Sequence, residues 1–311
     1  MPTPNRQMEQ EAEPLVIWRL TDGKPGHENQ SLGLCQALAR QRQVIRHDIV
    51  AVGRVGQWVQ WLSGRFPAGQ QLPPPDLILG AGHQTHLALL AARRAFGGRT
   101  VVIMKPSLPR FLFDLCVIPE HDGVSGGKVF VTQGVMNSVT SCVRDGSSQT
   151  LILLGGMSRH YAWKDETVIA QIESIVRHNP AQRFLLSDSR RTPAGCLEKI
   201  AALQLANLTL VPWQETGPGW VGRQLAESAA VWVSEDSVSM VYEAITSGAA
   251  VGLIGLEQTK PGRISRGVER LIEGGWVTPY RRWQETGRLP VPPGRFNEAE
   301  RCAEWMVAEW L

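Results

Sequence analysis

The stretch that decides the fold runs from Leu15 to Gln30 and reads LVIWRLTDGKPGHENQ. Its first six residues, Leu15–Leu20, are nearly all apolar, which is typical of a strand buried on both faces of a parallel sheet. A polar loop with two glycines follows, and a helical pattern then runs from Gln30 to Gln41. A buried strand, a loop and a helix in this order predict a Rossmann-like βα unit.

The same order recurs along the rest of the chain. In the first half we expect strands at Leu15–Leu20, Val44–Val50, Asp76–Leu79, Thr100–Met104, Leu115–Ile118 and Lys128–Val131, with helices at Gln30–Gln41, Val55–Leu62 and Thr85–Ala95. The second half restarts with strands at Thr150–Leu154, Arg183–Leu186, Leu208–Val211, Val231–Val233 and Ala250–Ile254, and with helices at Asp165–His178, Pro193–Leu203, Trp220–Ala226, Ser237–Ser247, Arg263–Glu273 and Glu298–Leu311. The sequence therefore predicts an α/β protein with two Rossmann-like domains that face a central cleft.

A polar segment near residues 134–149 separates the two series of elements and places the domain boundary. We expect a disordered lead-in at 1–14, an N-terminal domain at 15–145, a C-terminal domain at 146–288, and a final helical segment at 289–311.

The composition is that of an ordinary globular protein, with 43% hydrophobic and 20% charged residues among 311. A net charge of +3 is too small to indicate nucleic-acid binding. The excess of basic residues lies in the first half, where an ordinary solvated face is the expected explanation and an anionic membrane surface is the alternative. The five cysteines stand singly, so we expect neither disulfides nor a zinc site. The N-terminus lacks the order of a signal peptide and no apolar run could span a bilayer, so we expect a cytoplasmic protein, at most peripheral on the inner membrane.

Ligands of open α/β sheets bind outside the carboxyl ends of the strands, so the residues after each predicted strand are the candidates for a site. After the first strand, Asp22 and His27 are candidate bases, because a histidine has a pKa suited to proton transfer. Lys24 and Gly26 of the same loop could meet an anionic ligand. The alternative is an ordinary turn that leads into a helix.

Later strand ends of the first half carry Gly82 and His83, then Lys105, and then His121. We assign these four residues to acceptor binding. His83 and His86 are three apart, but no third ligand with metal spacing is evident, so we expect no metal site and no cofactor.

In the second half, glycines and arginines again follow predicted strands. Gly155 and Gly156 follow its first strand, and Ser189, Arg190 and Arg191 follow its second. We expect Thr192 to cap a helix that begins at Pro193, with both arginines beside its positive end, where a phosphate would bind. Two exposed arginines without a function are the alternative.

The segment from Glu235 to Glu243 carries the densest set of donor-binding candidates. We expect Asp236 or Ser237 to cap the helix that follows, which leaves N–H groups for a diphosphate. Glu243 lies two turns further on, where its carboxylate could accept hydrogen bonds from ribose hydroxyls. The donor-binding set is completed by Glu235 and Ser239.

Four segments together resemble the Elongated Mitochondria ("mitochondrial fission") family of plants and Gram-negative bacteria: 20–30, 119–122, 189–193 and 235–240. The resemblance covers most of residues 15–274. Bacterial relatives are similar to glycosyltransferases of lipooligosaccharide outer-core loci, and the wider pattern resembles GT-B glycosyltransferases.

That resemblance implies a donor nucleotide on the C-terminal domain, at positions that Ser237, Ser239 and Glu243 match. It also implies an acceptor near Gly26 and His27, and a final helix, Glu298–Leu311, that crosses back to the first domain. The loop at Asp22–His27 has fewer glycines than that of the enzyme that makes lipid II, so the acceptor and the stereochemistry stay open.

Our hypothesis is transfer of a sugar from a nucleotide sugar to a lipid-linked or lipopolysaccharide-core acceptor, without a DxD metal site. The helix N-terminus and Arg190 or Arg191 would stabilise the leaving diphosphate. One alternative is a non-catalytic adaptor that kept the scaffold. Another is a nucleotide-sugar epimerase that does not use NAD, since no GxGxxG follows the first strand.

Overall fold

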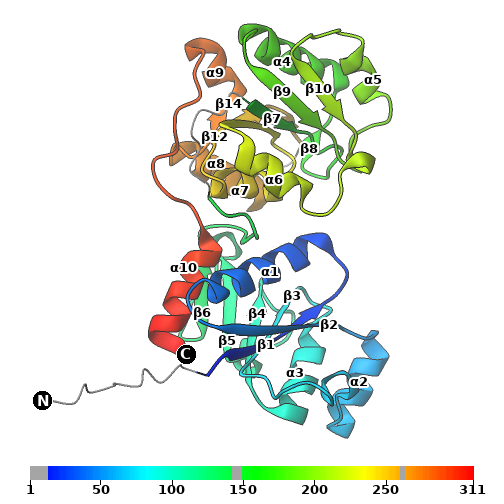
Figure 1. Ribbon diagram of the computed structural model, residues 1–311, viewed down its shortest axis with the longest axis vertical. Coiled ribbons are helices and arrows are strands. Elements are labelled where there is room, and N and C mark those ends of the chain that lie inside the picture. The colour runs from blue at the N-terminus through cyan, green and yellow to red at the C-terminus, as the bar shows by residue number, and fades with distance from the viewer. Residues whose placement is uncertain (1–12, 142–148, 260–262) are drawn as a thin grey trace, which may run out of the picture. The chain divides into compact units, whose positions relative to one another are not determined.

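The computed structural model describes residues 13–141, 149–259 and 263–311, with no account of the side chains of 263–265. These residues form two compact units (Figure 1). The N-terminal unit comprises the chain up to residue 118, residues 125–130 and residues 300–311, and the C-terminal unit comprises 119–124 and 131–299. The predicted boundary between 145 and 146, and most of the predicted lead-in at 1–14, lie outside the described residues.

The N-terminal unit is built on a six-stranded sheet in the order β2-β1-β3-β4-β5-β6. Its strands are β1 Leu15–Thr21, β2 Val44–Val50, β3 Leu77–Ala81, β4 Arg99–Ile103, β5 Leu115–Pro119 and β6 Val129–Thr132, and its first helices are α1 Pro25–Ala39, α2 Arg54–Ser63 and α3 His86–Phe96. The order reverses direction between β1 and β3, which pair in parallel with Leu20 opposite Gly80. A reversal of this kind opens a crevice at the carboxyl ends of the two strands, where ligands of such sheets bind.

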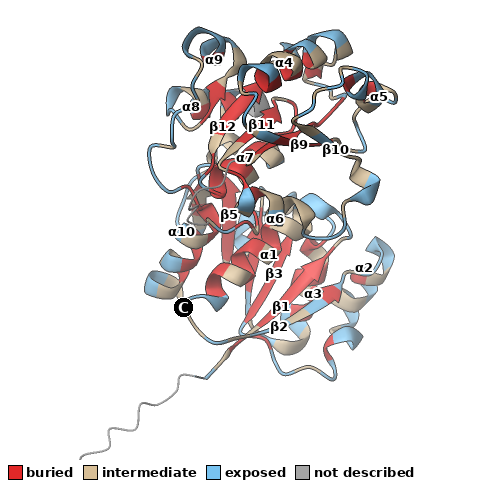
Figure 2. Ribbon diagram, turned by 45° about the horizontal axis from the view of Figure 1, so that its top comes forward, coloured by how far each residue is buried: buried red, intermediate tan, exposed pale blue. Residues whose placement is uncertain are grey.

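The first strand, β1, contributes several buried side chains to the core of this unit. Ile17, Trp18 and Leu20 are fully buried, as the red strands in Figure 2 show. The Trp18 ring lies against Phe66 and Phe96, and its indole N–H donates to the Pro73 carbonyl at 3.1 Å. A buried tryptophan with its single donor satisfied provides a large apolar contact without leaving a polar group unpaired.

The C-terminal unit has a second six-stranded sheet in the order β10-β9-β7-β11-β12-β14. Its strands are β7 Gln149–Leu153, β9 Arg183–Ser187, β10 Leu208–Val211, β11 Ala230–Ser234, β12 Ala250–Ile254 and β14 Thr278–Pro279, and a separate pair is formed by β8 Tyr161–Ala162 and β13 Glu257–Gln258. Its helices are α4 Asp165–His178, α5 Cys196–Ala201, α6 Trp220–Glu227, α7 Val238–Thr246, α8 Arg263–Glu273 and α9 Tyr280–Thr286.

Successive residues of β7 and β11 belong to two different cores. Leu151, Leu153 and Val233 pack in one hydrophobic cluster, whereas Ile152 and Trp232 pack in the other. Side chains alternate across a strand, so this division means that helices cover both faces of the sheet. The strand order reverses between β7 and β11, which pair in parallel, and this places a second crevice at their carboxyl ends.

The chain ends in α10 Glu298–Trp305 and a π-helical turn, Met306–Trp310, which belong to the N-terminal unit from residue 300 onward. Glu300 forms an ion pair with Arg40 at 2.8 Å, and the ring centres of Trp305 and Phe130 lie 5.2 Å apart. Arg301 also stacks over the Phe130 ring. The predicted return of the C-terminal helix to the first domain is confirmed.

Most predicted elements occur within two residues of their expected bounds, with three informative differences. α1 begins at Pro25 instead of Gln30, because proline is well suited to the first position of a helix. α5 begins at Cys196 instead of Pro193, and α9 was not predicted. The four described cysteines, Cys35, Cys116, Cys196 and Cys302, are buried free thiols, and Cys142 lies outside the described residues. Within the described ranges, no helix is both long enough and apolar enough to cross a bilayer.

Candidate functional site

The loop between β1 and α1 brings the two predicted bases together. The side chain of Asp22 is fully buried, and its Oδ2 lies 2.9 Å from Nδ1 of His27, which keeps 19% of its side-chain surface exposed. The other carboxylate oxygen, Oδ1, accepts the backbone N–H of Lys24 at 3.2 Å. An ionised carboxylate can only accept, so Nδ1 of His27 carries the proton and Nε2 has the lone pair of a general base.

Gly82, at the end of β3, makes room for His27. A Cβ on Gly82 would lie 2.2 Å from Nδ1 of His27, and the glycine has a φ of +81°. The predicted role of Gly82 was acceptor binding, and the structure shows that it lets the imidazole pack against the β3 loop. This contact across the β1–β3 crevice places His27 at the reversal point of the sheet.

His86, on the adjacent helix α3, is another histidine near His27. It was not assigned to the site from the sequence. It is the first residue of α3, it is buried, and its Nδ1 lies 3.2 Å from the Ser107 hydroxyl. Burial, together with the smaller electrostatic effects of His83 and His27, lowers the pKa of His86 to about 4. His86 is therefore neutral at neutral pH. Its burial could not be inferred from spacing alone, because His83, three residues earlier, is exposed.

The remaining predicted acceptor residues are distributed over both units. Lys24 and Lys105 are exposed, and Lys105 follows Met104, whose φ of +74° is unusual for a residue with a side chain. Gly26 lies in the first turn of α1, with no atom within 4 Å of a Cβ built there. His121 lies on a 3-10 turn, Glu120–Asp122, that belongs to the C-terminal unit, where Glu120 pairs with Arg270 at 2.6 Å.

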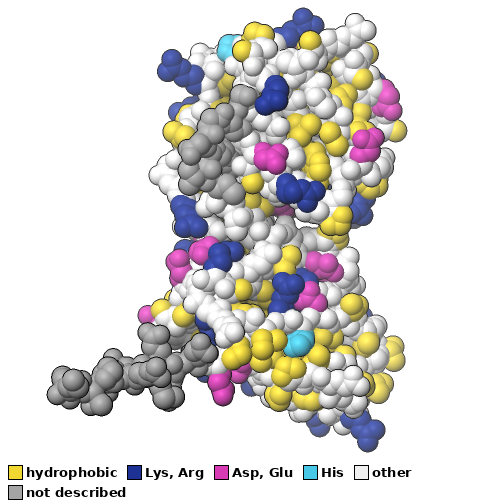
Figure 3. All heavy atoms as spheres, viewed as in Figure 1, with side chains coloured by type: hydrophobic (Ala, Val, Ile, Leu, Met, Phe, Trp, Pro, Cys, Tyr) yellow, Lys and Arg dark blue, Asp and Glu magenta, His cyan; other side chains and the backbone are white. Residues whose placement is uncertain are grey.

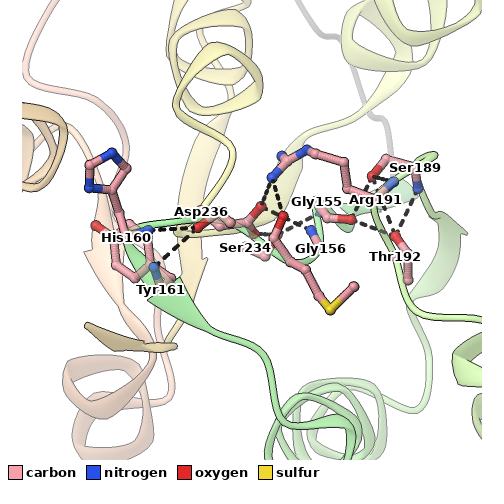
Figure 4. Close-up of polar contacts among 11 residues, drawn as sticks. Gly155, Gly156, His160, Tyr161, Ser189, Arg191, Thr192, Ser234 and Asp236 are labelled. Atoms are coloured by element: carbon pink, nitrogen blue, oxygen red, sulfur yellow. Dashed lines mark hydrogen bonds and ion pairs between the residues drawn. The ribbon is translucent and has the colours of Figure 1, made fainter. Parts of the chain in front are cut away.

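In the C-terminal unit, the predicted donor residues meet at the carboxyl ends of β7, β9 and β11 (Figure 4). The Gly155 carbonyl accepts hydrogen bonds from the hydroxyls of Ser189 and Thr192, both at 2.5 Å. A Cβ on Gly155 would lie 2.2 Å from Asp236, and one on Gly156 would lie 2.0 Å from the Arg191 carbonyl. Both glycines are thus required by the close approach of neighbouring loops.

Asp236 is the centre of this network. Its carboxylate is buried and accepts from the Gly156 N–H at 2.9 Å, from the Ser234 hydroxyl at 2.7 Å, and from Arg191 at 2.8 Å. Burial nevertheless raises the pKa of Asp236, because the loss of water outweighs the hydrogen bonds and the guanidinium charge. Asp236 therefore holds three strand ends in place, which is a role that the sequence did not reveal.

The expected start of the helix after these loops was wrong. Thr192 does not cap a helix at Pro193, because α5 starts only at Cys196, with Gly195 at its N-cap, and the Thr192 hydroxyl bonds to Gly155 instead. Arg191 pairs with Asp236, and Arg190 lies over the Trp213 ring with its guanidinium carbon 5.6 Å from the ring centre.

The helix α7 begins as predicted, next to this network. Ser237 occupies its N-cap position but makes no capping hydrogen bond through its side chain, and Asp236 is directed toward Gly156 instead. The first N–H groups of a helix have no partner within it, so this end of α7 offers donors to an anion. Ser239 is exposed and Glu243 is half-buried, one turn apart on the same side of the helix.

Glu235 points away from its neighbour Asp236. It accepts the Leu256 N–H at 3.1 Å and lines a cavity of about 710 Å³ with residues such as Gln171, Gly255 and Tyr280. Burial raises the pKa of Glu235, and the charge of Asp236 adds to this effect. Adjacent residues of a chain often face opposite sides, so the sequence could not show that Glu235 leaves the Asp236 network. Across the described ranges, no group of three or more His, Cys, Asp or Glu residues could hold a metal ion.

Comparison with known proteins identifies relatives and the fold. The uncharacterized protein RP120 of Rickettsia prowazekii (strain Madrid E) is 21% identical over 290 residues, which cover 75% of this chain and 81% of that protein. The UDP-GlcNAc 2-epimerase of Methanocaldococcus jannaschii is 12% identical with a TM-score of 0.59, over 94% of this chain and 99% of that one. The UDP-GlcNAc 2-epimerase of Neisseria meningitidis, bound to UDP-GlcNAc, is 12% identical with a TM-score of 0.55, over 94% and 100%.

These two likenesses show that the predicted fold is right: two Rossmann-like units of the GT-B type. The family described as "Mitochondrial fission ELM1" matches residues 25–310, which is most of the chain. The match includes His27 and the strand ends that surround Asp236, and it begins after Asp22. The protein therefore belongs to the mitochondrial fission ELM1 family.

Proposed function

We propose that the protein is a glycosyltransferase that moves a sugar from a nucleotide sugar to a hydroxyl of a lipid-linked or lipopolysaccharide-core acceptor. The observation that carries this proposal is the buried Asp22 carboxylate, 2.9 Å from His27, at the β1–β3 reversal of a GT-B fold. A carboxylate in this position fixes the tautomer of the imidazole and stabilises the cation that forms when the ring takes a proton. The pair thus has the chemistry of a general base.

In an inverting transfer, the acceptor hydroxyl oxygen forms a bond to the anomeric carbon of the donor sugar. Nε2 of His27 takes the hydroxyl proton, and the bond from the anomeric carbon to the diphosphate oxygen breaks with its electron pair on the leaving group. Asp22 balances the charge of the imidazolium. In a retaining transfer, His27 would orient the sugar instead.

We assign the donor to the C-terminal unit. The N–H groups at the start of α7, with Ser237 and Ser239, would meet the diphosphate, and Glu243 would accept hydrogen bonds from the ribose hydroxyls. Arg190, exposed above Trp213, can add positive charge. Arg191 already faces Asp236, so it contributes less to the leaving group. This assignment requires no cofactor. The Neisseria epimerase, whose description names UDP-GlcNAc, supports a nucleotide sugar as the class of ligand.

The proposal is tested first with a panel of nucleotide sugars in a thermal-shift assay. A ligand at one hundred times its Kd should stabilise the folded protein by about 2.7 kcal/mol. The stabilising donor is then incubated with an extracted lipid-linked acceptor, and release of the nucleoside diphosphate is measured. His27→Ala and Asp22→Asn should lower kcat by about 10²–10⁴-fold while the donor still raises the Tm.

The control is His178→Ala, which removes an exposed histidine at the end of α4. It should keep full transfer activity. Equal transfer by His27→Ala and the unaltered protein would refute the assignment of the base.

A nucleotide-sugar epimerase is the second candidate, because both solved structures compared above are UDP-GlcNAc 2-epimerases. An epimerase converts its nucleotide sugar without an acceptor, so NMR of the donor incubated alone separates the two reactions. An adaptor without activity would show no stabilisation by any nucleotide sugar of the panel.

A further inference from the structure

Helix α2 of the N-terminal unit has its apolar side turned outward. Val55, Trp58, Val59 and Leu62 follow the i, i+3, i+4, i+7 spacing of one helix face, and their exposed fractions are 80%, 51%, 61% and 64%. The buried residue of the helix is a polar one, Gln57, whose amide donates to the carbonyls of Val52 and Gln84. The usual arrangement of an amphipathic surface helix is therefore inverted.

This exposure is concentrated in one place. Ten large apolar side chains are exposed among the described residues, and only Met157 and Val291 belong to the C-terminal unit. The remaining exposed ones include Val50 and Val52, just before α2, and Phe111, on the 3-10 turn Arg110–Leu112. Contiguous exposed apolar surface of this kind marks an interaction site.

The surroundings of this face are basic. Arg54 is the first residue of α2 and Arg65 follows the helix, and both are exposed. Arg94 is exposed on the adjacent helix α3, as is Arg93, which pairs with Asp114 at 3.3 Å. Figure 3 shows hydrophobic and basic side chains together over this part of the N-terminal unit. α2 itself has no acidic residue. A helix with an apolar face, tryptophan and flanking arginines has the features of one that lies in a membrane interface and is attracted to anionic lipids.

We propose that the outward face of α2 docks the protein on an anionic membrane surface. Val55, Val59 and Leu62 would enter the boundary between headgroups and acyl chains. Trp58 would lie at headgroup depth, where its ring is partly apolar and its N–H can still meet a polar partner. The arginines meet the lipid phosphates. A second copy of the chain fits this face less well, because its arginines would be brought toward one another in a symmetric contact.

The position of this face also suits the lipid-linked acceptor of the proposed function. Docking on a membrane does not itself depend on that function. A groove of about 610 Å³ runs along the unit, lined by Trp58 and Trp61 of α2, Leu87 and Leu90 of α3, and the histidines His83 and His86. It thus connects the docking face with the loop of Gly82, which contacts His27. A lipid-linked acceptor held by the membrane would have an apolar path from the bilayer to the base.

The test is co-sedimentation of the full-length protein with vesicles of phosphatidylcholine alone and of phosphatidylcholine mixed with phosphatidylglycerol. We expect binding to the anionic vesicles only, decreasing as salt is added. The triple variant Val55→Ser, Val59→Ser, Leu62→Ser changes only exposed side chains and should weaken partitioning at least about tenfold. The matched control, Val291→Ser, removes an equally exposed valine from the C-terminal unit and should bind as the unaltered protein does.

Circular dichroism establishes that each variant is folded. Binding of the triple variant to anionic vesicles at the level of the unaltered protein would overturn the proposal, as would an absence of vesicle binding by the unaltered protein. A dimer that dissociates in the triple variant, without vesicle binding, would identify a contact between copies and also overturn it. Because vesicle binding needs no sugar donor, its outcome is separate from that of the transfer assay.

Discussion

Gly82 and His27 are in such close contact that any side chain at position 82 would collide with the imidazole. A Cβ there would lie 2.2 Å from Nδ1, the same atom that bonds to Asp22. The position of the candidate base is therefore determined by two neighbours, a carboxylate that binds its ring and a glycine that leaves space for it.

Gly82→Ala should displace His27 from Asp22 and lower the rate of sugar transfer at least about 100-fold, because a base out of place loses its alignment with the acceptor. The control is Gly97→Ala in the same unit, where φ is +78° and nothing lies within 4 Å of the added Cβ. That control carries only the backbone cost of about 1–2 kcal/mol and should retain activity. Equal loss of stability and full activity in both variants would show that the collision has no effect.

Asp236→Ala should destabilise the C-terminal unit by about 2–4 kcal/mol, because it leaves the Gly156 N–H and the Ser234 hydroxyl buried without their acceptor. Arg191 adds little to this sum, since 42% of its side chain is exposed to water. Chemical denaturation measures the change. Glu173→Ala, which breaks a surface pair with Arg177, should cost no more than about 0.5 kcal/mol. Similar values for the two variants would contradict the role given to Asp236.

The stability of the N-terminal unit should depend on pH through His86. Its pKa falls from 6.5 to about 4 on folding, so the unfolded chain binds a proton at a pH where the folded chain does not. The free energy of unfolding is therefore unaffected by His86 above pH 6.5, and it decreases as the pH falls from 6.5 toward about 4.

His86→Gln keeps a polar partner for Ser107 and removes the titrating ring, so the variant should lose less stability than the unaltered protein between about pH 7 and about pH 5. Urea denaturation at both pH values gives the comparison. The control is His178→Gln, which changes an exposed histidine of the C-terminal unit and should leave the pH dependence as it was. Parallel pH dependence in all three proteins would be evidence against a neutral buried His86.

Because residues 300–311 belong to the N-terminal unit, we expect them to stabilise that unit. Met306 is fully buried, so Met306→Ala should cost about 2–5 kcal/mol. Glu304→Ala, an exposed change on the preceding turn, should be nearly neutral. Hydrogen exchange can locate the loss, which we expect in β4, β5 and β6. A loss confined to the C-terminal unit would contradict this packing.

Much of the architecture could be predicted because a buried parallel strand is a continuous apolar run. Ala250–Ile254 is such a run and has the bounds expected from the sequence. Val44–Val50 and Leu208–Val211 also have the expected bounds, although they are edge strands with polar residues. The start of α1 was missed because glycine and proline at Pro25–Gly26 look like a loop, although proline is favourable in the first turn. The short strands β8, β13 and β14 have two residues each, which is too few for a periodic pattern.

For the candidate site, the sequence indicated residues after the strand ends, but it did not give their contacts and it missed His86. Asp22 and His27 are close in the chain, so their pairing follows from one loop. Asp236, Gly156 and Arg191 come from three strand ends, and only the sheet order β9-β7-β11 makes them neighbours. For the same reason, the burial of Gln57 and the outward face of α2 could not be inferred, since the spacing shows that a helix has an apolar face but not where that face points.

The position of residues 300–311 in the N-terminal unit has a consequence for how the protein is made. A ribosome synthesises the entire C-terminal unit before these residues emerge, so the sheet of the N-terminal unit must wait, with the Phe130 side of β6 uncovered, until α10 arrives. The C-terminal unit can therefore be completed before the N-terminal unit. During synthesis, the first part of the chain to be made is therefore the last to be finished.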